Sequence, residues 1–115
     1  MTGLRLFAAP AKPMRNAALG LLLLSAASGA QAADVIRGAD LYRTHCAHCH
    51  GAQGRPVMPM APDFTRLDPL MQPDPRLLQS IRNGRGAMPG YQGLLRDRDI
   101  LDVIAHLRTL PMRTP

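Results

Sequence analysis

Cys46-Ala47-His48-Cys49-His50 is the most informative segment of the chain. It is a C-x-x-C-H run, and it contains both cysteines of the 115 residues. On one helical turn the two thiols can form thioethers with the two vinyl groups at one edge of a porphyrin, and the histidine that follows is then presented to the iron. The motif therefore predicts covalent attachment of one haem c through Cys46 and Cys49, with His50 as the proximal iron ligand.

A C-x-x-C pair has two other common uses. A structural zinc site needs four ligands, and although His48, His50 and His106 carry suitable nitrogens, no partner C-x-x-C or H-x₃₋₅-H pair occurs at a suitable spacing. A thioredoxin-like redox dithiol lies at the end of a strand in a βαβ unit, and no such pattern surrounds the motif. Both uses stay open as alternatives, and haem attachment is favoured.

The first 32 residues have the composition of a secretory signal peptide. They carry no acid and three cations, Arg5, Lys12 and Arg15. An apolar stretch follows over residues 17–27, and Ala30-Gln31-Ala32 has the small residues that flank a cleavage site. The apolar run is shorter than the roughly 20 residues that a membrane-spanning helix needs, so we expect cleavage after Ala32 rather than a retained anchor.

Cleavage leaves one domain of 83 residues, 33–115, without a second hydrophobic segment long enough to span a membrane. We therefore expect a soluble periplasmic protein with no stable membrane insertion, which agrees with the extracytoplasmic attachment of c-type haem in bacteria. The full chain has a formal net charge of +6, but in the mature part 11 arginines face 8 aspartates, a balance of +3. Because no basic cluster with interleaved aromatics occurs, nucleic acid is not an expected partner.

The mature domain has few large side chains with which to build a core. Its aromatic residues are Tyr42, Phe64 and Tyr91, and it has no tryptophan. Domains of this size usually need a disulfide, a metal or a cofactor for stability. A porphyrin would supply a large apolar surface for side chains to cover. The composition and the C-x-x-C-H motif therefore both indicate a bound haem.

The helix-capping residues, the glycines and prolines, and the spacing of the apolar residues together predict three helices and one long loop. Asp34 is a candidate N-cap for a first helix that runs into the Cys46–His50 turn and stops at Gly51. The apolar positions of this helix are Val35, Ile36, Ala39 and Tyr42. From Arg55 to Pro75, six prolines exclude regular helix and central strand. Apolar residues in this segment favour an ordered loop that covers something apolar: Val57, Met58, Met60, Phe64 and Leu67.

A second helix is expected from Asp74, as its N-cap, to Gly84, which ends it. Its buried stripe is Leu77, Leu78 and Ile81. A last helix starts near Asp97 or Asp99 and is closed by Pro111. The apolar stripe of that helix is Ile100, Val103, Ile104 and Leu107. With no strand pattern, the sequence predicts an all-α domain whose three main helices and proline-rich loop wrap around one covalent haem.

A six-coordinate haem needs a second axial ligand opposite His50. Five methionines lie in the mature chain, at positions 58, 60, 71, 88 and 112. Met88 lies among glycines and before a proline, in Gly84-Arg85-Gly86-Ala87-Met88-Pro89-Gly90-Tyr91, which favours a loop pressed against a porphyrin face. This local pattern favours Met88 and leaves Met58 and Met60 as alternatives.

The chain resembles the small bacterial class I cytochromes c over essentially the whole mature region. The matching segments are Gly38-Ala39-Asp40-Leu41-Tyr42, Cys46-Ala47-His48-Cys49-His50-Gly51, Ala61-Pro62-Asp63-Phe64, Gly86-Ala87-Met88-Pro89-Gly90-Tyr91 and the C-terminal helix. The resemblance implies that Met88 is the distal iron ligand. It also implies that the Pro62 carbonyl accepts the Nδ1 hydrogen of His50, and that Gly38 and Tyr42 cross the last helix closely.

One position departs from that family. His106 takes a place in the last helix where the family often has an aromatic residue, and we expect it to pack there with one ring nitrogen hydrogen-bonded. His45 and His48 lie too near the attachment turn to reach the opposite haem face, and we expect both to be exposed.

Ligation by histidine and methionine would fill both axial positions of the iron, which leaves outer-sphere transfer of one electron as the natural activity. We therefore expect a monomeric periplasmic carrier of single electrons between redox protein partners, not an enzyme. Arg82, Arg85 and Arg96 are candidates for a docking rim that faces an acidic partner. Two alternatives stay open: a dedicated haem subunit of a periplasmic oxidoreductase, and a haem sensor or enzyme that binds a small ligand at the iron.

Overall fold

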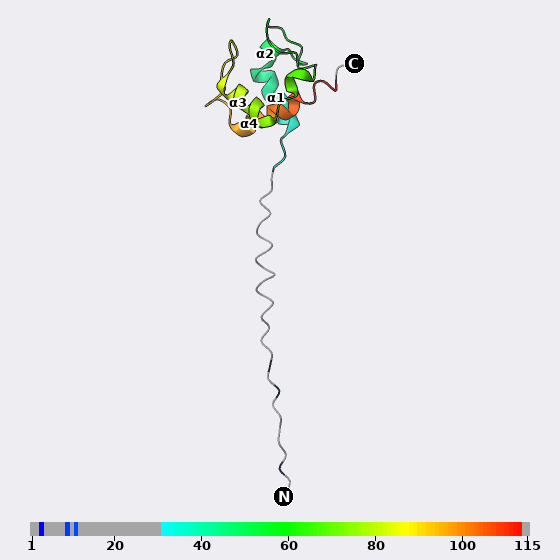
Figure 1. Cartoon of the computed structure of the whole chain (residues 1–115), viewed down its shortest axis with the longest axis vertical. Helices are drawn as coiled ribbons and strands as arrows, with labels where there is room; N and C mark the ends of the chain where they lie inside the picture. The colour runs from blue at the N-terminus through cyan, green and yellow to red at the C-terminus, as the bar shows by residue number, and fades with distance from the viewer. Residues whose placement is uncertain (1–2, 4–8, 10, 12–30, 114–115) are drawn as a thin grey trace. The chain divides into compact units, whose positions relative to one another are not determined.

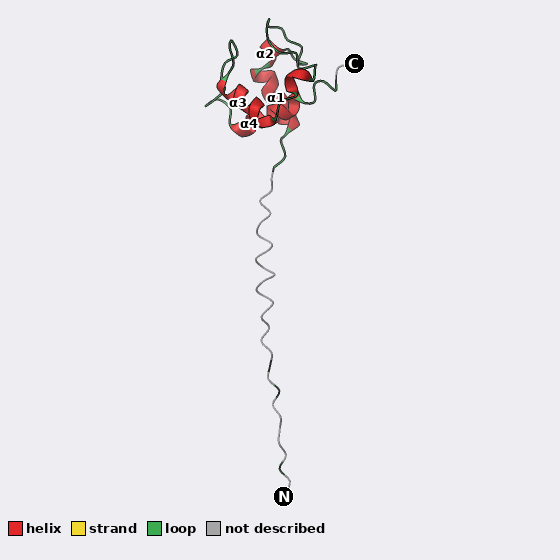
Figure 2. Ribbon diagram, in the orientation of Figure 1, coloured by secondary structure: helices red, strands yellow, loops and turns green. Residues whose placement is uncertain are grey.

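The computed structural model describes residues 31–113 together with Gly3, Ala9 and Ala11. The predicted signal segment, residues 1–32, lies almost entirely outside the described residues, and Ala32–Pro115 form one compact unit. The helices of that unit are α1 (Val35–His45), α2 (Ala47–His50), the 3₁₀ helix η1 (Asp68–Leu70), α3 (Asp74–Asn83) and α4 (Asp97–Leu107) (Figure 1). The described residues form helices and loops with no sheet (Figure 2), so the all-α prediction is confirmed. Among them, no helix has the length and apolar character needed to cross a membrane.

The first and last helices, α1 and α4, cross at a point where only a glycine fits. A Cβ atom placed on Gly38 would lie 1.9 Å from the backbone oxygen of Asp102, far inside van der Waals contact. Tyr42, one turn further along α1, is buried at the same crossing, and its ring centre lies 5.3 Å from that of His106. The close crossing of the first and last helices is therefore confirmed.

The apolar core consists of two clusters, and α4 contributes to both. One cluster contains Tyr42, Leu70, Val103, Leu107 and Leu110. The other contains Leu77, Tyr91, Leu95, Ile100 and Ile104. The predicted stripe of α4 is buried at all four positions, each at most 4% exposed, so α4 is the element that joins the rest of the fold.

Two aspartates of α4 are buried, which periodicity did not predict. Asp102 is fully buried and accepts hydrogen bonds from the Asp34 amide at 2.8 Å and from Nη1 of Arg37 at 3.0 Å. Asp99 binds Arg37 as well, and it accepts the amide and Nε of Arg96, both at 3.0 Å. These hydrogen bonds, those from Arg96 above all, hold the pKa of the Asp99 carboxyl well below its usual value. The start of α1 is thus tied to α4 by charged hydrogen bonds.

Several helix ends lie where the sequence predicts them. Asp34 caps α1, because its Oδ1 accepts the amides of Ile36 and Arg37 at 3.0 Å each. Gly84 follows the last residue of α3, and α4 begins at Asp97. Ile36 itself is 79% exposed, contrary to the prediction, because α1 buries its glycine and tyrosine instead.

Two predictions about helix ends are wrong. Asp74 is the first residue of α3 rather than its N-cap, because Pro73 occupies the cap position and the Asp74 carboxylate binds Arg108. The last helix ends at Leu107 and not at Pro111, since the chain continues from there in tighter turns with i→i+3 hydrogen bonds.

Gly38→Ala should destabilise the folded protein by about 1–3 kcal/mol, because the added methyl group would overlap the Asp102 carbonyl and force α1 away from α4. Urea unfolding followed by circular dichroism measures the change. Ile36→Ala, on the exposed face of the same helix, is the matched control and should change stability by no more than about 0.5 kcal/mol. Equal stability of Gly38→Ala and wild type would contradict the close crossing.

The lowered pKa of Asp99 makes stability depend on pH. A carboxyl whose pKa is lower in the folded than in the unfolded state contributes its full stabilisation above the unfolded value of about 4, and this is lost as the pH falls below it. We expect Asp99→Asn to be less stable at neutral pH and to lose less stability on acidification than wild type. Asp40→Asn, at an exposed carboxylate, is the control. Identical acid profiles of wild type and Asp99→Asn would refute the assignment.

Candidate functional site

Cys46 lies between α1 and α2, and Cys49 and His50 follow it in the single turn of α2; these residues form the attachment turn. The turn stays helical across the junction, because the amides of Cys49 and His50 both donate to the Cys46 carbonyl, at 3.2 and 3.0 Å. Both cysteines are half-buried free thiols. The spacing of the motif therefore places the two thiols on one turn, as predicted, with the histidine directly after them.

The helix crossing supports this turn from behind. The hydroxyl of Tyr42 donates to the carbonyl of Gly51 at 2.7 Å, directly after His50. Burial raises the pKa of Tyr42 far above its ordinary value, so the phenol remains a hydrogen-bond donor. On the other side, the amides of Val57 and Met58 donate to the Cys49 carbonyl at 3.0 Å each, which ties the proline-rich loop to the turn.

His50 is held as a neutral, oriented imidazole. The side chain is buried, its ring stacks on Phe64 with 4.8 Å between ring centres, and burial lowers the pKa of the ring. Its Nδ1 atom is buried without a hydrogen-bond partner. The backbone of Pro62 lies close to the ring and partly offsets this effect, since it raises the pKa of His50. The Pro62 carbonyl does not, however, complete a hydrogen bond with Nδ1 in the structure.

The attachment turn lines a cavity of about 640 Å³. Met88 lines the same cavity from a separate segment, and so do Met58 and Met60. Met88 is half-buried and packs against the core cluster of α3 and α4, whereas Met58 is 44% and Met60 fully exposed. An iron ligand must be held in place, so the geometry favours Met88 among the three methionines.

The loop that carries Met88 is built to hold one shape. The amides and carbonyls of Arg85 and Met88 exchange two hydrogen bonds, of 3.0 and 2.9 Å. At the base of the loop, a Cβ on Gly84 would lie 2.6 Å from the Met88 carbonyl oxygen and from the Gly90 amide nitrogen. Beyond it, the hydroxyl of Tyr91 donates at 2.7 Å to the carbonyl of His45, next to the attachment turn. The thioether is thus presented by a short, braced loop.

Neither alternative use of the cysteine pair gains support from the geometry. Burial, with a smaller contribution from Cys49, raises the pKa of the Cys46 thiol to about 11, whereas a redox-active cysteine has a lowered pKa. Within residues 31–113, no three side chains of the types His, Cys, Asp and Glu gather to form a metal-ion site. Of the three uses of the cysteine pair, the geometry therefore favours covalent attachment.

The residues that line the cavity fit a haem. Its volume lies within the range of cofactor pockets, and its walls include apolar side chains from α3 and α4 such as Leu77 and Leu107. An imidazole and a thioether, the axial donors found in cytochromes c, both line this cavity, and the Nδ1 atom of His50 is free of any other partner. Two thiols beside the imidazole complete the donor set for a covalently bound porphyrin.

The histidines outside the motif agree only in part with expectation. His106 packs against Tyr42 as predicted, and its Nδ1 atom is buried without a hydrogen-bond partner. His48 is exposed as predicted. The prediction for His45 is wrong, because its ring is half-buried and lies edge-on to Tyr91, with 6.1 Å between ring centres.

The sequence did not predict one contact of the site, the stacking of Phe64 on His50. Phe64 was expected only to cover an apolar surface, yet it is the ring against which His50 stacks. The available signal was its place two residues after Pro62, within a segment that already matched the family. The remaining apolar residues of the loop are largely exposed: Val57, Met58, Met60 and Leu67.

Comparison with known proteins agrees with this geometry. A family model described as cytochrome c oxidase, cbb3-type, subunit III matches residues 33–107. Cytochrome c6 of Thermosynechococcus vestitus is 33% identical over 90 residues, which cover 75% of this chain and 79% of that protein. Cytochrome c6 of Nostoc sp. is 32% identical over 94 residues, covering 77% and 84%. The structure of cytochrome c6 from the diatom Phaeodactylum tricornutum matches with a TM-score of 0.58 and 27% identity, covering 69% of this chain and 95% of that one.

The fold and the site define a small electron-transfer protein that carries one covalent haem c. The chain belongs to the mono-haem class I cytochromes c and is related to cytochrome c6. Its activity is electron transfer and not enzymatic catalysis.

Met88→Ala should abolish the weak sulfur-to-iron charge-transfer absorption of the oxidised protein, admit imidazole to the iron and lower the reduction potential, because a thioether favours the reduced iron. Optical titration and voltammetry measure these changes. Met58→Ala and Met60→Ala are the controls and should leave the absorption intact. If either control loses it while Met88→Ala keeps it, the ligand assignment is wrong.

Proposed function

We propose that the chain is exported to the periplasm, cleaved after Ala32, and carries single electrons between redox protein partners. The observation that carries the proposal is the cavity of about 640 Å³, in which the attachment turn and the braced Met88 loop meet. We assign the thioethers to Cys46 and Cys49, the proximal iron ligand to His50 and the distal ligand to Met88.

When bound, the haem supplies an iron that alternates between the ferrous and ferric states. His50 and Met88 would hold the iron from two separate segments of the chain, which would leave no coordination position for a substrate. Leu77, Tyr91 and Leu107 line the cavity and exclude water from its walls. A rigid, apolar pocket limits the rearrangement that accompanies a change of charge, which favours rapid outer-sphere transfer.

We also propose that the Pro62 carbonyl orients the ring of His50, the proximal ligand. Its backbone already raises the pKa of the His50 ring, while Nδ1 of that ring lacks a partner. A small shift of the loop would let the carbonyl accept the Nδ1 hydrogen, which fixes the ring and increases its basicity toward the iron.

Of the three arginines predicted to form a docking rim, Arg85 is the one that we propose contacts the partner. Arg82 and Arg96 are already paired with carboxylates of α4, those of Asp97 and Asp99. Arg85 is exposed, lines the haem cavity and has no ion-pair partner among the described residues. We propose that an acidic surface of the redox partner approaches the cavity at Arg85, so that Arg85→Gln slows transfer mainly at low ionic strength.

A dedicated subunit of an oxidoreductase is the second candidate function, and the match to an oxidase subunit family favours it. A free carrier elutes alone as a monomer from periplasmic extract and reduces or oxidises partners in solution. Elution in a stable complex with one oxidoreductase would favour the subunit.

The mature protein should keep its colour after denaturation and acid–acetone extraction, because the haem is held by covalent bonds. Its mass should equal that of residues 33–115 plus one haem, and the protein should be found in the periplasmic fraction. Mass spectrometry of the extracted protein tests attachment and cleavage together. Cys46→Ala and Cys49→Ala should each sharply lower the yield of haem protein. Colour that extracts freely from wild type would contradict covalent attachment of the haem. A mass that includes residues 1–32 would contradict cleavage after Ala32.

A further inference from the structure

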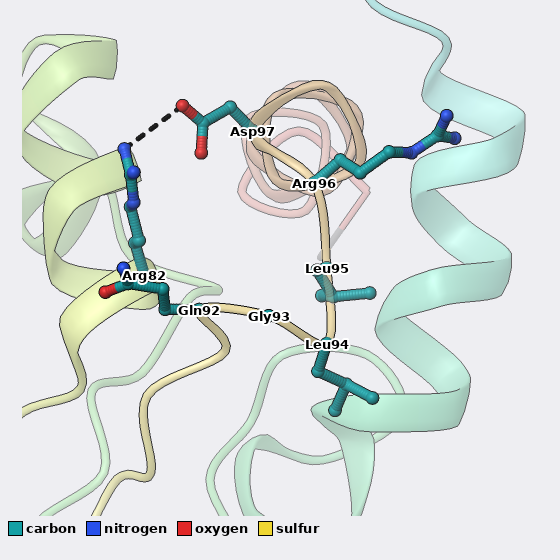
Figure 3. Close-up of a pocket in the computed structure, with 7 residues that line it drawn as sticks. All are labelled: Arg82, Gln92, Gly93, Leu94, Leu95, Arg96 and Asp97. Atoms are coloured by element: carbon teal, nitrogen blue, oxygen red, sulfur yellow. Dashed lines mark hydrogen bonds and ion pairs between the residues drawn. The ribbon is translucent and has the colours of Figure 1, made fainter.

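Helices α3 and α4 are joined at both ends by arginine–aspartate pairs. Asp74, the first residue of α3, accepts Nε of Arg108 at 3.1 Å, directly after the end of α4. Arg82, in the last turn of α3, donates to Asp97, the first residue of α4, at 3.2 Å (Figure 3). The two helices therefore run antiparallel with one ion pair at each end.

The two ends are held with different strength. The Arg108 guanidinium also donates to the carbonyls of Leu70 and Gln72, each at 2.8 Å, so it makes hydrogen bonds to three residues. The Arg82–Asp97 pair is a single contact between side chains that are 42% and 53% exposed. Exposed pairs are weak and are screened by salt. The start of α3 is thus held by several hydrogen bonds. At its end, the exposed ion pair adds a weak, salt-sensitive contact to the packing of Ile81 against the core cluster of α3 and α4.

The end of α3 that bears the exposed ion pair also carries the Met88 loop. The amides of Tyr91 and Gln92 donate to the carbonyls of Ile81 and Arg82, at 3.1 and 3.0 Å, so the segment after Met88 is attached to the last turn of α3. Figure 3 shows the following segment running from Gln92 to Asp97 at the start of α4, beside a cavity of about 260 Å³. Arg82, in the last turn of α3, lines this cavity together with Asp97, so the Arg82 side chain has space in which to move away from the Asp97 carboxylate.

We propose that the Arg82–Asp97 pair is a latch that positions the Met88 loop and sets how readily Met88 leaves the iron. The proposal rests on the assignment of Met88 as the distal ligand. With the latch closed, the last turn of α3 holds the loop against the cavity. With the latch open, that turn and the attached loop move together about the fixed Arg108 end, and an external ligand gains access to the iron.

Imidazole binding to the oxidised haem protein tests the latch, at a pH where imidazole is neutral. In wild type its affinity should rise about two- to fivefold between about 0.01 and 1 M salt, as screening opens the pair. Arg82→Gln and Asp97→Asn should both show the raised affinity already at low salt and lose the salt dependence. The double variant should do no more than either single variant. Hydrogen exchange of the Tyr91 and Gln92 amides should speed up by a similar factor.

Arg43→Gln is the matched control, since it removes an exposed arginine of an Asp40 ion pair on α1. It should behave as wild type, and Arg82→Lys, which keeps the charge, should restore much of the salt dependence. The proposal would be overturned if Arg82→Gln and Asp97→Asn both kept the imidazole affinity and salt dependence of wild type. It would also be overturned if one variant raised the affinity and the other lowered it, because opposite signs indicate a general effect of charge. If wild type lacks the charge-transfer absorption, the Met88 assignment fails and the latch with it; if the absorption is present, unchanged latch variants refute the latch alone.

Discussion

The contact between Gly38 of α1 and the Asp102 carbonyl of α4 is the constraint on which the site depends. Because no side chain separates the two backbones, Tyr42 lies deep in the crossing, and its hydroxyl reaches the carbonyl directly after His50. His50, the proposed proximal ligand, is thus positioned by contacts of Gly38 and Tyr42, which lie twelve and eight residues before it in the chain. The charged hydrogen bonds of Asp99 and Asp102 fasten the same crossing at the start of α1.

The two proposed iron ligands, His50 and Met88, are held in place by contacts of unequal strength. His50 lies at the end of a helical turn that is backed by Tyr42 and stacked on Phe64. Met88 lies on a short loop that is hydrogen-bonded to the last turn of α3, and an exposed ion pair joins that turn to α4. An electron carrier needs both ligands to stay in place through each change of iron charge. If Met88 and His50 are the two iron ligands, as we propose, exchange of Met88 depends on the contacts of α3 and exchange of His50 depends on the core.

Local features of the sequence predicted much of the fold and the site. The C-x-x-C-H motif, the Asp34 cap and the α4 stripe depend on residues within a few positions of one another, so they can be recognised without a structure. Burial of Asp99 and Asp102 depends on Arg37, more than 60 positions away in sequence, and periodicity carries no signal of it. The stacking of Phe64 on His50 and the pairing of Arg82 with Asp97 likewise arise only when the chain folds.

The central claim is that the haem completes the core of a chain too poor in large side chains to fold alone. The two apolar clusters share α4, and the cavity opens beside both, with Leu77, Tyr91 and Leu107 on its walls. The most direct test is far-ultraviolet circular dichroism of residues 33–115 with Cys46→Ala and Cys49→Ala, prepared without haem. The account predicts little stable helix and no cooperative unfolding transition, since isolated helices of this length are marginal in water. A fully helical apoprotein that unfolds cooperatively would contradict it.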